Sequence, residues 1–248
     1  MKKFELTTES IFVCGRKLYR IRAVKDFGDV KKGDLGGFVE TEDNLSQTDD
    51  AWVYGKAMVY GKARVCGEAR VYGNAEVYGY AEVCGNARVY GNARVYGNAR
   101  IHGNARVHGN AEVYGNAEVC GNARVRGNAR VYGNARVYEN AWVYEYAWVC
   151  GNARVYGKAK VCRNAWVYEN ARICESNDYA TVTGFGSQLR TTTFFRQKDN
   201  SLGVKCGCFS GTMEEFKDKV TETHGDNKYA KEYLMIAALM ELHFKEEG

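Results

Sequence analysis

Small and branched apolar residues return at a fixed six-residue spacing through the middle of the chain. Alanine occupies every sixth position from Ala51 to Ala171, and Val or Ile follows two positions later each time, 21 times in all. The unit is Ala-x-Val-Tyr-Gly-Asn, with Gly at 16 of the 21 fifth positions and Asn at 14 of the 21 sixth positions. Because strand side chains alternate between faces, Ala and Val of each unit share one face. The pattern predicts a short strand with an apolar inner face in every unit.

The Gly-Asn pair at the end of each unit predicts a change of chain direction, since these residue types best tolerate positive φ. Successive hairpins would need longer arms than three residues. We therefore expect a solenoid in which each strand pairs with the equivalent strand one coil later. Asparagines at equivalent corners can then form hydrogen-bonded ladders.

The phase of the repeat, in which a branched aliphatic residue precedes a small one by four positions, resembles the hexapeptide repeat of left-handed β-helices. That resemblance implies a mainly β fold with three units, or 18 residues, in each triangular coil, so residues 51–176 would form about seven coils. One departure is the position after Val, which is mostly Tyr here. A flat two-sided solenoid with 12-residue coils remains the alternative.

The two ends of the chain lack the repeat. Residues 1–50 contain an alternating segment over 17–22, which predicts a strand, and the glycine-rich segment 32–37, which predicts a turn. We expect this part to be an N-terminal cap that covers the open end of the first coil.

Residues 177–248 predict a small α+β module that caps the other end of the solenoid or joins subunits. Its predicted elements are strands over 191–195 and 204–209 and helices over 212–223 and 228–245. Thr212 and Glu215 have the spacing of a capping box at the start of the first helix.

The whole pattern, including the opening segments Gly15–Ile21 and Gly33–Val39, resembles uncharacterised β-helical proteins encoded by bacteriophages and prophages. This resemblance implies the fold and a phage-type origin, but it carries no activity.

The amino-acid composition excludes several classes of protein. The chain of 248 residues has no proline and 26% charged residues, which excludes collagen-like and proline-rich disordered proteins. No apolar run reaches the ~18 residues of a membrane span, and the basic start lacks the apolar region of a signal peptide. Nine cysteines without a secretion signal predict free thiols and a location in the reducing bacterial cytoplasm.

An 18-residue coil would stack outward positions 18 apart into columns. Two such columns largely alternate Arg and Glu, as in a self-neutralising surface ladder. The third column has four arginines in succession with no acid among them, which are Arg70, Arg88, Arg106 and Arg124. The column beside it contains Tyr72, Tyr90, His108 and Arg126.

Arginine beside an aromatic ring can grip phosphate and stack on a base. The segment 51–176 also has 17 Lys and Arg against nine Asp and Glu, which favours an anionic partner. These eight residues are therefore the candidate ligand site. A subunit interface is the alternative for the same face, because interfaces are also enriched in Tyr and Arg.

The sequence contains less support for an enzymatic function. Hexapeptide acyltransferases use a histidine base between subunits, and His102 and His108 are candidates by residue type alone. However, the repeat has no extruded substrate loop, and both histidines occupy ordinary tyrosine positions. Cys66, Cys84 and Cys120 share a column with His102, but no local Cys-x-x-Cys spacing supports a metal site. We expect no catalytic residues, metal or cofactor.

The sequence therefore predicts a non-enzymatic phage-type binding protein that binds a host component or sequesters an anionic, nucleotide-like ligand, as an inhibitor of anti-phage defence would. We expect a homo-oligomer, with a trimer ahead of a dimer. The two other hypotheses are a hexapeptide-type acyltransferase acting on a small molecule and a nucleic-acid-binding solenoid.

Overall fold

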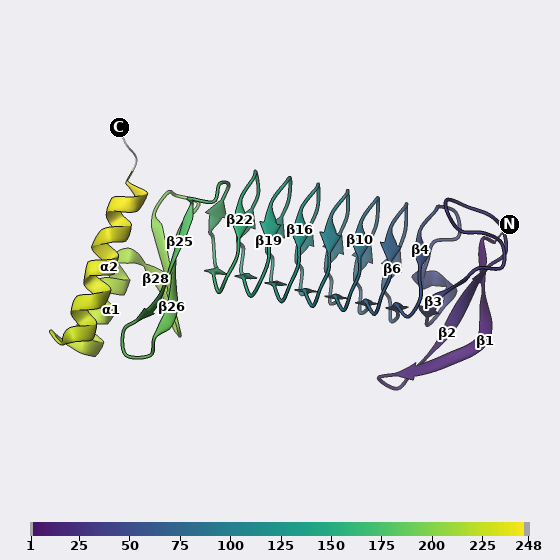
Figure 1. Cartoon of the computed structure of the whole chain (residues 1–248), viewed down its shortest axis with the longest axis horizontal. Helices are drawn as coiled ribbons and strands as arrows, with labels where there is room; N and C mark the ends of the chain where they lie inside the picture. Colours follow the sequence, from purple (N-terminus) through teal and green to yellow (C-terminus); the bar gives the residue numbers. More distant parts are fainter. Residues whose placement is uncertain (1, 246–248) are drawn as a thin grey trace.

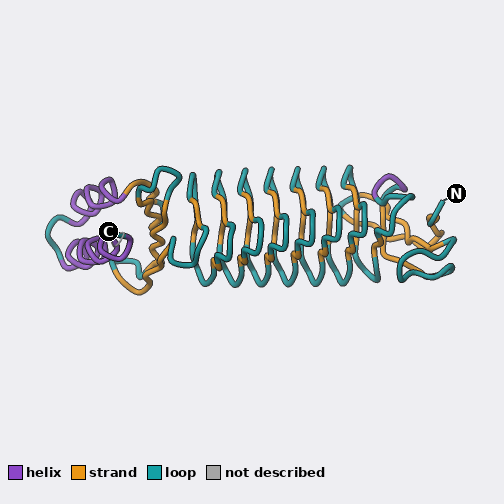
Figure 2. Tube along the Cα trace, turned by 90° about the horizontal axis from the view of Figure 1, so that it is seen from above, coloured by secondary structure: helices purple, strands orange, loops and turns teal. Residues whose placement is uncertain are grey.

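The six-residue units wind into a parallel β-solenoid in a computed structural model that describes residues 2–245 (Figure 1). Each unit supplies a two-residue strand, and each strand pairs in parallel with the strand 18 residues further on. Val89, for example, pairs with Val71 and with Val107. The 18-residue coil is thereby confirmed, and the 12-residue alternative is wrong. The successive coils are visible from above in Figure 2.

The strands form three sheets that run along the solenoid. The first contains β5 (Met58–Val59), β8 (Glu76–Val77), β11 (Arg94–Val95), β14 (Glu112–Val113), β17 (Arg130–Val131), β20 (Trp148–Val149) and β23 (Trp166–Val167). The second contains β4 (Trp52–Val53), β7 (Arg70–Val71), β10 (Arg88–Val89), β13 (Arg106–Val107), β16 (Arg124–Val125), β19 (Trp142–Val143) and β22 (Lys160–Val161). The third contains β6 (Arg64–Val65), β9 (Glu82–Val83), β12 (Arg100–Ile101), β15 (Glu118–Val119), β18 (Arg136–Val137), β21 (Arg154–Val155) and β24 (Arg172–Ile173).

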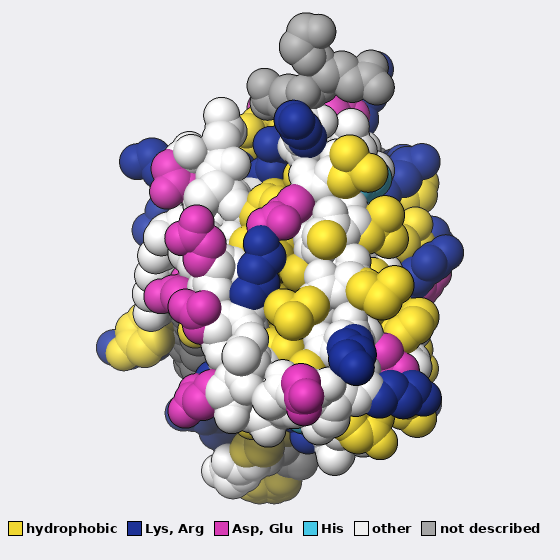
Figure 3. Space-filling model, turned by 90° about the vertical axis from the view of Figure 1, so that its left-hand side faces the viewer, with side chains coloured by type: hydrophobic (Ala, Val, Ile, Leu, Met, Phe, Trp, Pro, Cys, Tyr) yellow, Lys and Arg dark blue, Asp and Glu magenta, His cyan; other side chains and the backbone are white. Residues whose placement is uncertain are grey.

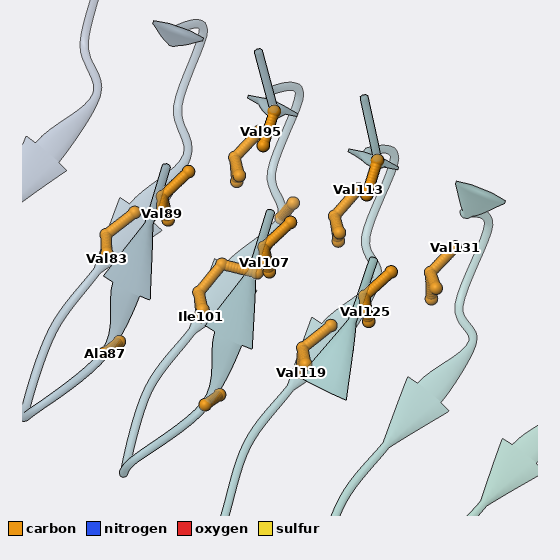
Figure 4. Packing of buried hydrophobic residues seen from close by; sticks show 14 of the residues in the cluster. Val83, Ala87, Val89, Val95, Ile101, Val107, Val113, Val119, Val125 and Val131 are labelled. Carbon is orange, nitrogen blue, oxygen red and sulfur yellow. The ribbon is translucent and has the colours of Figure 1, made fainter. Parts of the chain in front are cut away.

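The core is the narrow interior between the three sheets. Every repeat alanine from Ala51 to Ala171 and every repeat Val or Ile from Val53 to Ile173 is at most 1% exposed. Figure 4 shows these side chains pointing inward from successive coils. The predicted inner face is confirmed.

Glycine and asparagine have different roles at the corners of each coil. The repeat glycines have positive φ, and a Cβ on Gly91 would lie 3.0 Å from the backbone nitrogen of Gly109 in the next coil. Only glycine meets both conditions without strain. The asparagines form the expected ladders, in which Asn74 donates to Asn92 and Asn92 donates to Asn110, each at 3.1 Å.

The structure corrects the prediction that the cysteines are free. Cys66 and Cys84 form a disulfide, with a Cα–Cα distance of 4.7 Å. The reason is the register, because equivalent positions of adjacent coils face each other at a distance that a disulfide spans. The other seven cysteines are free.

The N-terminal segment joins the first sheet through three strands. Antiparallel β1 (Phe4–Val13) and β2 (Arg16–Ala23) precede β3 (Leu35–Val39), which pairs in parallel with β5. The predicted strand over 17–22 is confirmed, but Gly36 and Gly37 lie in β3 rather than in a turn. A Cβ on these glycines would lie 2.6 Å and 2.4 Å from the carbonyl oxygens of Val53 and Ala57. The short helix η1 (Glu42–Asn44) follows β3.

The open end of the first coil is closed by buried side chains of this segment. Lys3 is 1% exposed, and its ammonium group donates to the carbonyl oxygens of Asp49 and Ala51 at 2.6 and 2.7 Å. Phe4 and Phe27 pack edge-on against Trp52. Trp52, which by sequence begins the outward arginine column, is therefore buried, because the N-terminal segment covers it.

The C-terminal segment forms a four-stranded antiparallel sheet with two helices (Figure 1). Its elements are β25 (Tyr179–Phe185), β26 (Arg190–Arg196), β27 (Leu202–Cys206), β28 (Phe209–Thr212), α1 (Met213–His224) and α2 (Lys228–Phe244). The predicted helices and the capping box of Thr212 with Glu215 are confirmed. The strand predicted over 204–209 is instead interrupted by a tight turn at Gly207, where φ is +57°.

One face of this sheet carries the helices, and β26 contacts the end of the solenoid. Thr193 accepts a hydrogen bond from the backbone of Trp166 at 3.0 Å, and Ala171 forms a bridge with Gln197. Phe195 belongs to the solenoid core. The segment thus caps the last coil. Within residues 2–245, no helix has the length and hydropathy needed to span a membrane.

Candidate anion-binding face

The four arginines of the predicted column stand side by side on the second sheet. Arg88 is the direct pairing partner of both Arg70 and Arg106, and Arg106 is the partner of Arg124. The register therefore brings together the like charges that the 18-residue spacing predicts. We name this surface, with the neighbouring column Tyr72, Tyr90, His108 and Arg126, the arginine face.

The N-terminal segment supplies an acid at one end of this face. Asp29 forms an ion pair with Arg70 at 2.9 Å and accepts a hydrogen bond from the Tyr54 hydroxyl at 3.0 Å. The sequence shows no acid among the four arginines of the column, and the structure adds Asp29 from outside it as a partner of Arg70. No signal in the repeat could have revealed Asp29, because it lies outside the repeat, between Phe27 and Val30.

Aromatic rings hold the cations at the other end. The Arg124 guanidinium lies 4.7 Å from the centroid of the Trp142 ring. Arg126 lies 5.4 Å from the Trp142 ring and 5.0 Å from the Tyr144 ring. These cation–π contacts replace carboxylates as partners. The Nε of Arg126 is nevertheless buried without a hydrogen-bond partner in the described chain.

In the part of the chain that the structure describes, the positive charges in the middle of the arginine face are not neutralised by a partner group. Among residues 2–245, Arg88 and Arg106 have no ion pair, hydrogen-bonded acceptor or aromatic partner for their guanidinium groups. Beside them, Tyr72 stacks on Tyr90 with ring centroids 4.7 Å apart, and Tyr90 stacks on His108 at 4.6 Å. Two unpaired cations thus line one side of a continuous stack of rings.

A small cleft opens where this face meets the N-terminal segment. It has a volume of about 310 Å³ and is lined by Asp29, Tyr54, Arg70, Tyr72 and Arg88. Burial, followed by the hydrogen bond to Asp29, raises the pKa of Tyr54 to about 12. The Tyr54 phenol therefore stays protonated and neutral at physiological pH.

His108 adds no positive charge to this face at neutral pH. Burial lowers its pKa, and the charges of Arg126, Arg124 and Arg106 lower it further. The neutral imidazole acts on this face as a stacking ring rather than as a cation.

Arg–Glu ion pairs form within both of the other columns, in the parts where the two residue types alternate. Glu112 binds Arg130 at 3.2 Å on the first sheet, and Glu118 binds Arg136 at 2.7 Å on the third. The first sheet also carries the tyrosine ladder, whose rings stack with centroids 4.9 to 5.0 Å apart: Tyr60, Tyr78, Tyr96, Tyr114 and Tyr132.

The structure adds the carboxylate of Glu118 to His102 and Cys120, which the sequence spacing had placed in one column. His102, Glu118 and Cys120 place one donor atom each within 4.8 Å of one another. One carboxylate oxygen of Glu118 contacts His102 at 2.7 Å, and the other contacts Arg136 at 2.7 Å. This donor set suits a zinc-type ion, which would have to replace His102 as the partner of Glu118. The pairing of adjacent coils is the signal that reveals the group.

Comparison with protein families matches part of the repeat. The family described as the YdcK beta solenoid repeat matches residues 81–95, 87–103, 93–109 and 129–145. No curated protein matches the chain. The matched repeats and the observed coils together identify the central part of this chain as a repeat β-helix similar to the YdcK beta solenoid repeat.

Proposed function

We propose that this chain is a non-enzymatic binding protein that holds an anionic, nucleotide-like ligand on its arginine face. The observation that carries the proposal is the pair Arg88 and Arg106, which stand in register without an acidic partner beside stacked rings. The same repeat places Glu between arginines on the other two sheets. An anionic ligand would supply the negative charge on this face that glutamate supplies on the other two sheets.

The ligand chemistry follows from the two kinds of group on this face. Guanidinium groups bind phosphate through charge-assisted hydrogen bonds, and the edges of the Tyr72–Tyr90–His108 stack lie next to them. A nucleotide combines a phosphate with an aromatic base. We propose the further role of a phage-type protein that sequesters such a ligand, or a host component carrying one, in the bacterial cytoplasm.

The test is the double change Arg88→Glu with Arg106→Glu, assayed by calorimetric titration with adenosine diphosphate. Loss of two charge-assisted bonds, each contributing about 1.5–3 kcal/mol, should weaken binding by at least about 100-fold. The matched control is Arg64→Glu with Arg154→Glu, which makes the same charge change at the same repeat position of the third sheet. Circular dichroism should show both variants folded, because all four side chains point outward.

Two outcomes would contradict the proposal. If adenosine diphosphate binds the double variant with the same affinity and the same stoichiometry as the parent, or if the control loses binding to the same extent, the arginine face is not the site. A single-stranded oligonucleotide that binds with a steep salt dependence while adenosine diphosphate does not bind would indicate a nucleic-acid-binding solenoid instead.

We also propose that the chain forms a homo-oligomer, with a trimer ahead of a dimer. Met235, Leu239 and Leu242 of α2 are 74%, 57% and 70% exposed. Hydrophobic side chains gather along one side of this end of the molecule (Figure 3). Light scattering at micromolar concentration should give a multiple of 27.8 kDa, and the monomer mass would refute the assembly.

A further inference from the structure

A cavity lies at the junction between the solenoid and the C-terminal sheet, and it is larger than the cleft at the arginine face. Its volume is about 620 Å³, within the range of small-molecule sites. Nine residues line it: Tyr146, Trp148, Asn164, Trp166, Arg190, Thr191, Lys205, Gly207 and Cys208. None of them is acidic. The cavity lies on the first sheet, away from the arginine face.

One wall of the cavity is aromatic and comes from the last coils. Trp148 and Trp166 occupy the same column and stack with centroids 4.6 Å apart and planes 7° from parallel. The outer side of Trp148 is covered by Arg130, whose guanidinium lies 5.0 Å from the ring. The backbone of Trp166 is held by Thr193 of β26. This wall is rigid, since both indoles belong to paired strands.

The C-terminal sheet contributes two cations to the lining of the cavity. Lys205 on β27 places its ammonium group 5.4 Å from the centroids of both Trp166 and Tyr168. A Cβ on Gly207 would lie 2.3 Å from a terminal nitrogen of Arg190, so the glycine leaves room for that guanidinium. Neither cation has an ion pair within residues 2–245.

The carboxylates of Glu145 and Glu169 have hydrogen-bond partners outside the lining of the cavity. Glu145 accepts a hydrogen bond from the backbone of Arg163 at 2.8 Å, and Glu169 accepts one from Ser210 at 3.3 Å. The positive charge of Lys205 and Arg190 is thus not cancelled inside the cavity. A cavity with an indole wall and two cations that have no carboxylate partner suits a planar ring that bears an anionic group.

We infer that this junction cavity is a second ligand site, which binds a mononucleotide-sized aromatic anion that contacts both the indoles of Trp148 and Trp166 and the cations of Lys205 and Arg190. The site needs both the solenoid and the C-terminal sheet, so ligand binding would fasten the module to the last coils. This inference does not depend on the ligand proposed for the arginine face.

The experiment uses the full chain with Arg88→Glu and Arg106→Glu as the background, so that the arginine face cannot contribute. Adenosine monophosphate, adenosine and ribose 5-phosphate are titrated calorimetrically, and tryptophan fluorescence is recorded in parallel. Adenosine monophosphate should bind and quench the fluorescence, while each half-molecule should bind at least about tenfold more weakly, because it lacks either the anion or the ring.

Added to this background, Lys205→Gln with Arg190→Gln should weaken binding of adenosine monophosphate by at least about tenfold. The matched control, Lys198→Gln with Arg154→Gln, should leave it unchanged. Trp166→Phe should reduce both affinity and quenching, whereas Trp142→Phe on the second sheet should not reduce the affinity. Circular dichroism confirms that each variant is folded.

The outcomes separate the two proposals. If the background variant binds no adenosine monophosphate, or if the Lys205 and Arg190 changes leave its affinity unaltered, the junction site is refuted whatever the arginine face does. If the parent and the background bind equally and only the cavity variants lose binding, the junction site stands and the arginine face fails.

Discussion

Replacing Val107 with aspartate should unfold the middle of the solenoid. Val107 is fully buried and pairs with Val89 and Val125 in the coils on either side. Its side chain points into an interior filled by Ala and Val (Figure 4). A carboxylate there has no partner, so we expect a loss of at least about 4 kcal/mol in the free energy of unfolding.

Urea unfolding followed by circular dichroism measures this loss, and limited proteolysis reports where the chain opens. Each coil of a solenoid contacts only its neighbours, so cleavage should begin near Val107. The control is Val107→Ile, because the same position of the repeat already holds Ile101 and Ile173. We expect that change to alter the stability by less than about 1 kcal/mol. An aspartate variant as stable as the parent would contradict the buried inner face.

Raising the pH above about 10 should destabilise the protein through its tyrosines. Burial raises the pKa of Tyr96 to about 12, with the nearby charge of Glu112 adding to the effect. Burial and the bonded Glu76 carboxylate raise the pKa of Tyr60, and burial raises that of Tyr132. The folded state therefore holds these phenol protons more tightly than the unfolded chain does, whose tyrosines titrate near about 10.

This difference in pKa determines that the stability falls as the pH rises. The stabilisation is fully present below the unfolded pKa of about 10 and is lost as the pH rises through the folded values. Phenolate absorbance and circular dichroism should therefore change together above pH about 10. Tyr96→Phe keeps the stacked ring without the hydroxyl, so its alkaline midpoint should lie higher than that of the parent. Phenols that titrate near their ordinary pKa while the fold persists would contradict the buried ladder.

Lys3 opposes this trend over a small range. Burial lowers its pKa from the ordinary value of 10.5, although Asp49 raises it in part. The unfolded chain then binds more protons at this group, so stability rises with pH in the window just below 10.5. One lysine against several tyrosines leaves the net effect at high pH destabilising.

The period of the sequence predicted a solenoid with an inner face of Ala and Val, and the resemblance to hexapeptide β-helices added the 18-residue coil that defines the columns. Ala and Val repeated six residues apart with no insertion face inward in a coil of either 12 or 18 residues. The structure decides for 18, in which Val89, Val107 and Val125 stack. The same period placed Arg70, Arg88, Arg106 and Arg124 in one line and the asparagines in ladders. Because the units repeat without insertion, the contacts between neighbouring coils follow from the spacing in the sequence once the coil length is known.

The tertiary structure decided what happens where the period stops. Asp29 reaches Arg70 because the N-terminal segment folds back over the first coils, and Lys205 reaches Trp166 because the C-terminal sheet docks on the last ones. The Cys66–Cys84 bond arises between positions that the sequence placed in one column but did not join. Inside the repeat every neighbour is known from a fixed offset of 18 residues, whereas at the ends the neighbours depend on how non-repeating segments pack. That physical difference separates the predicted solenoid from the sites that only the folded chain completes.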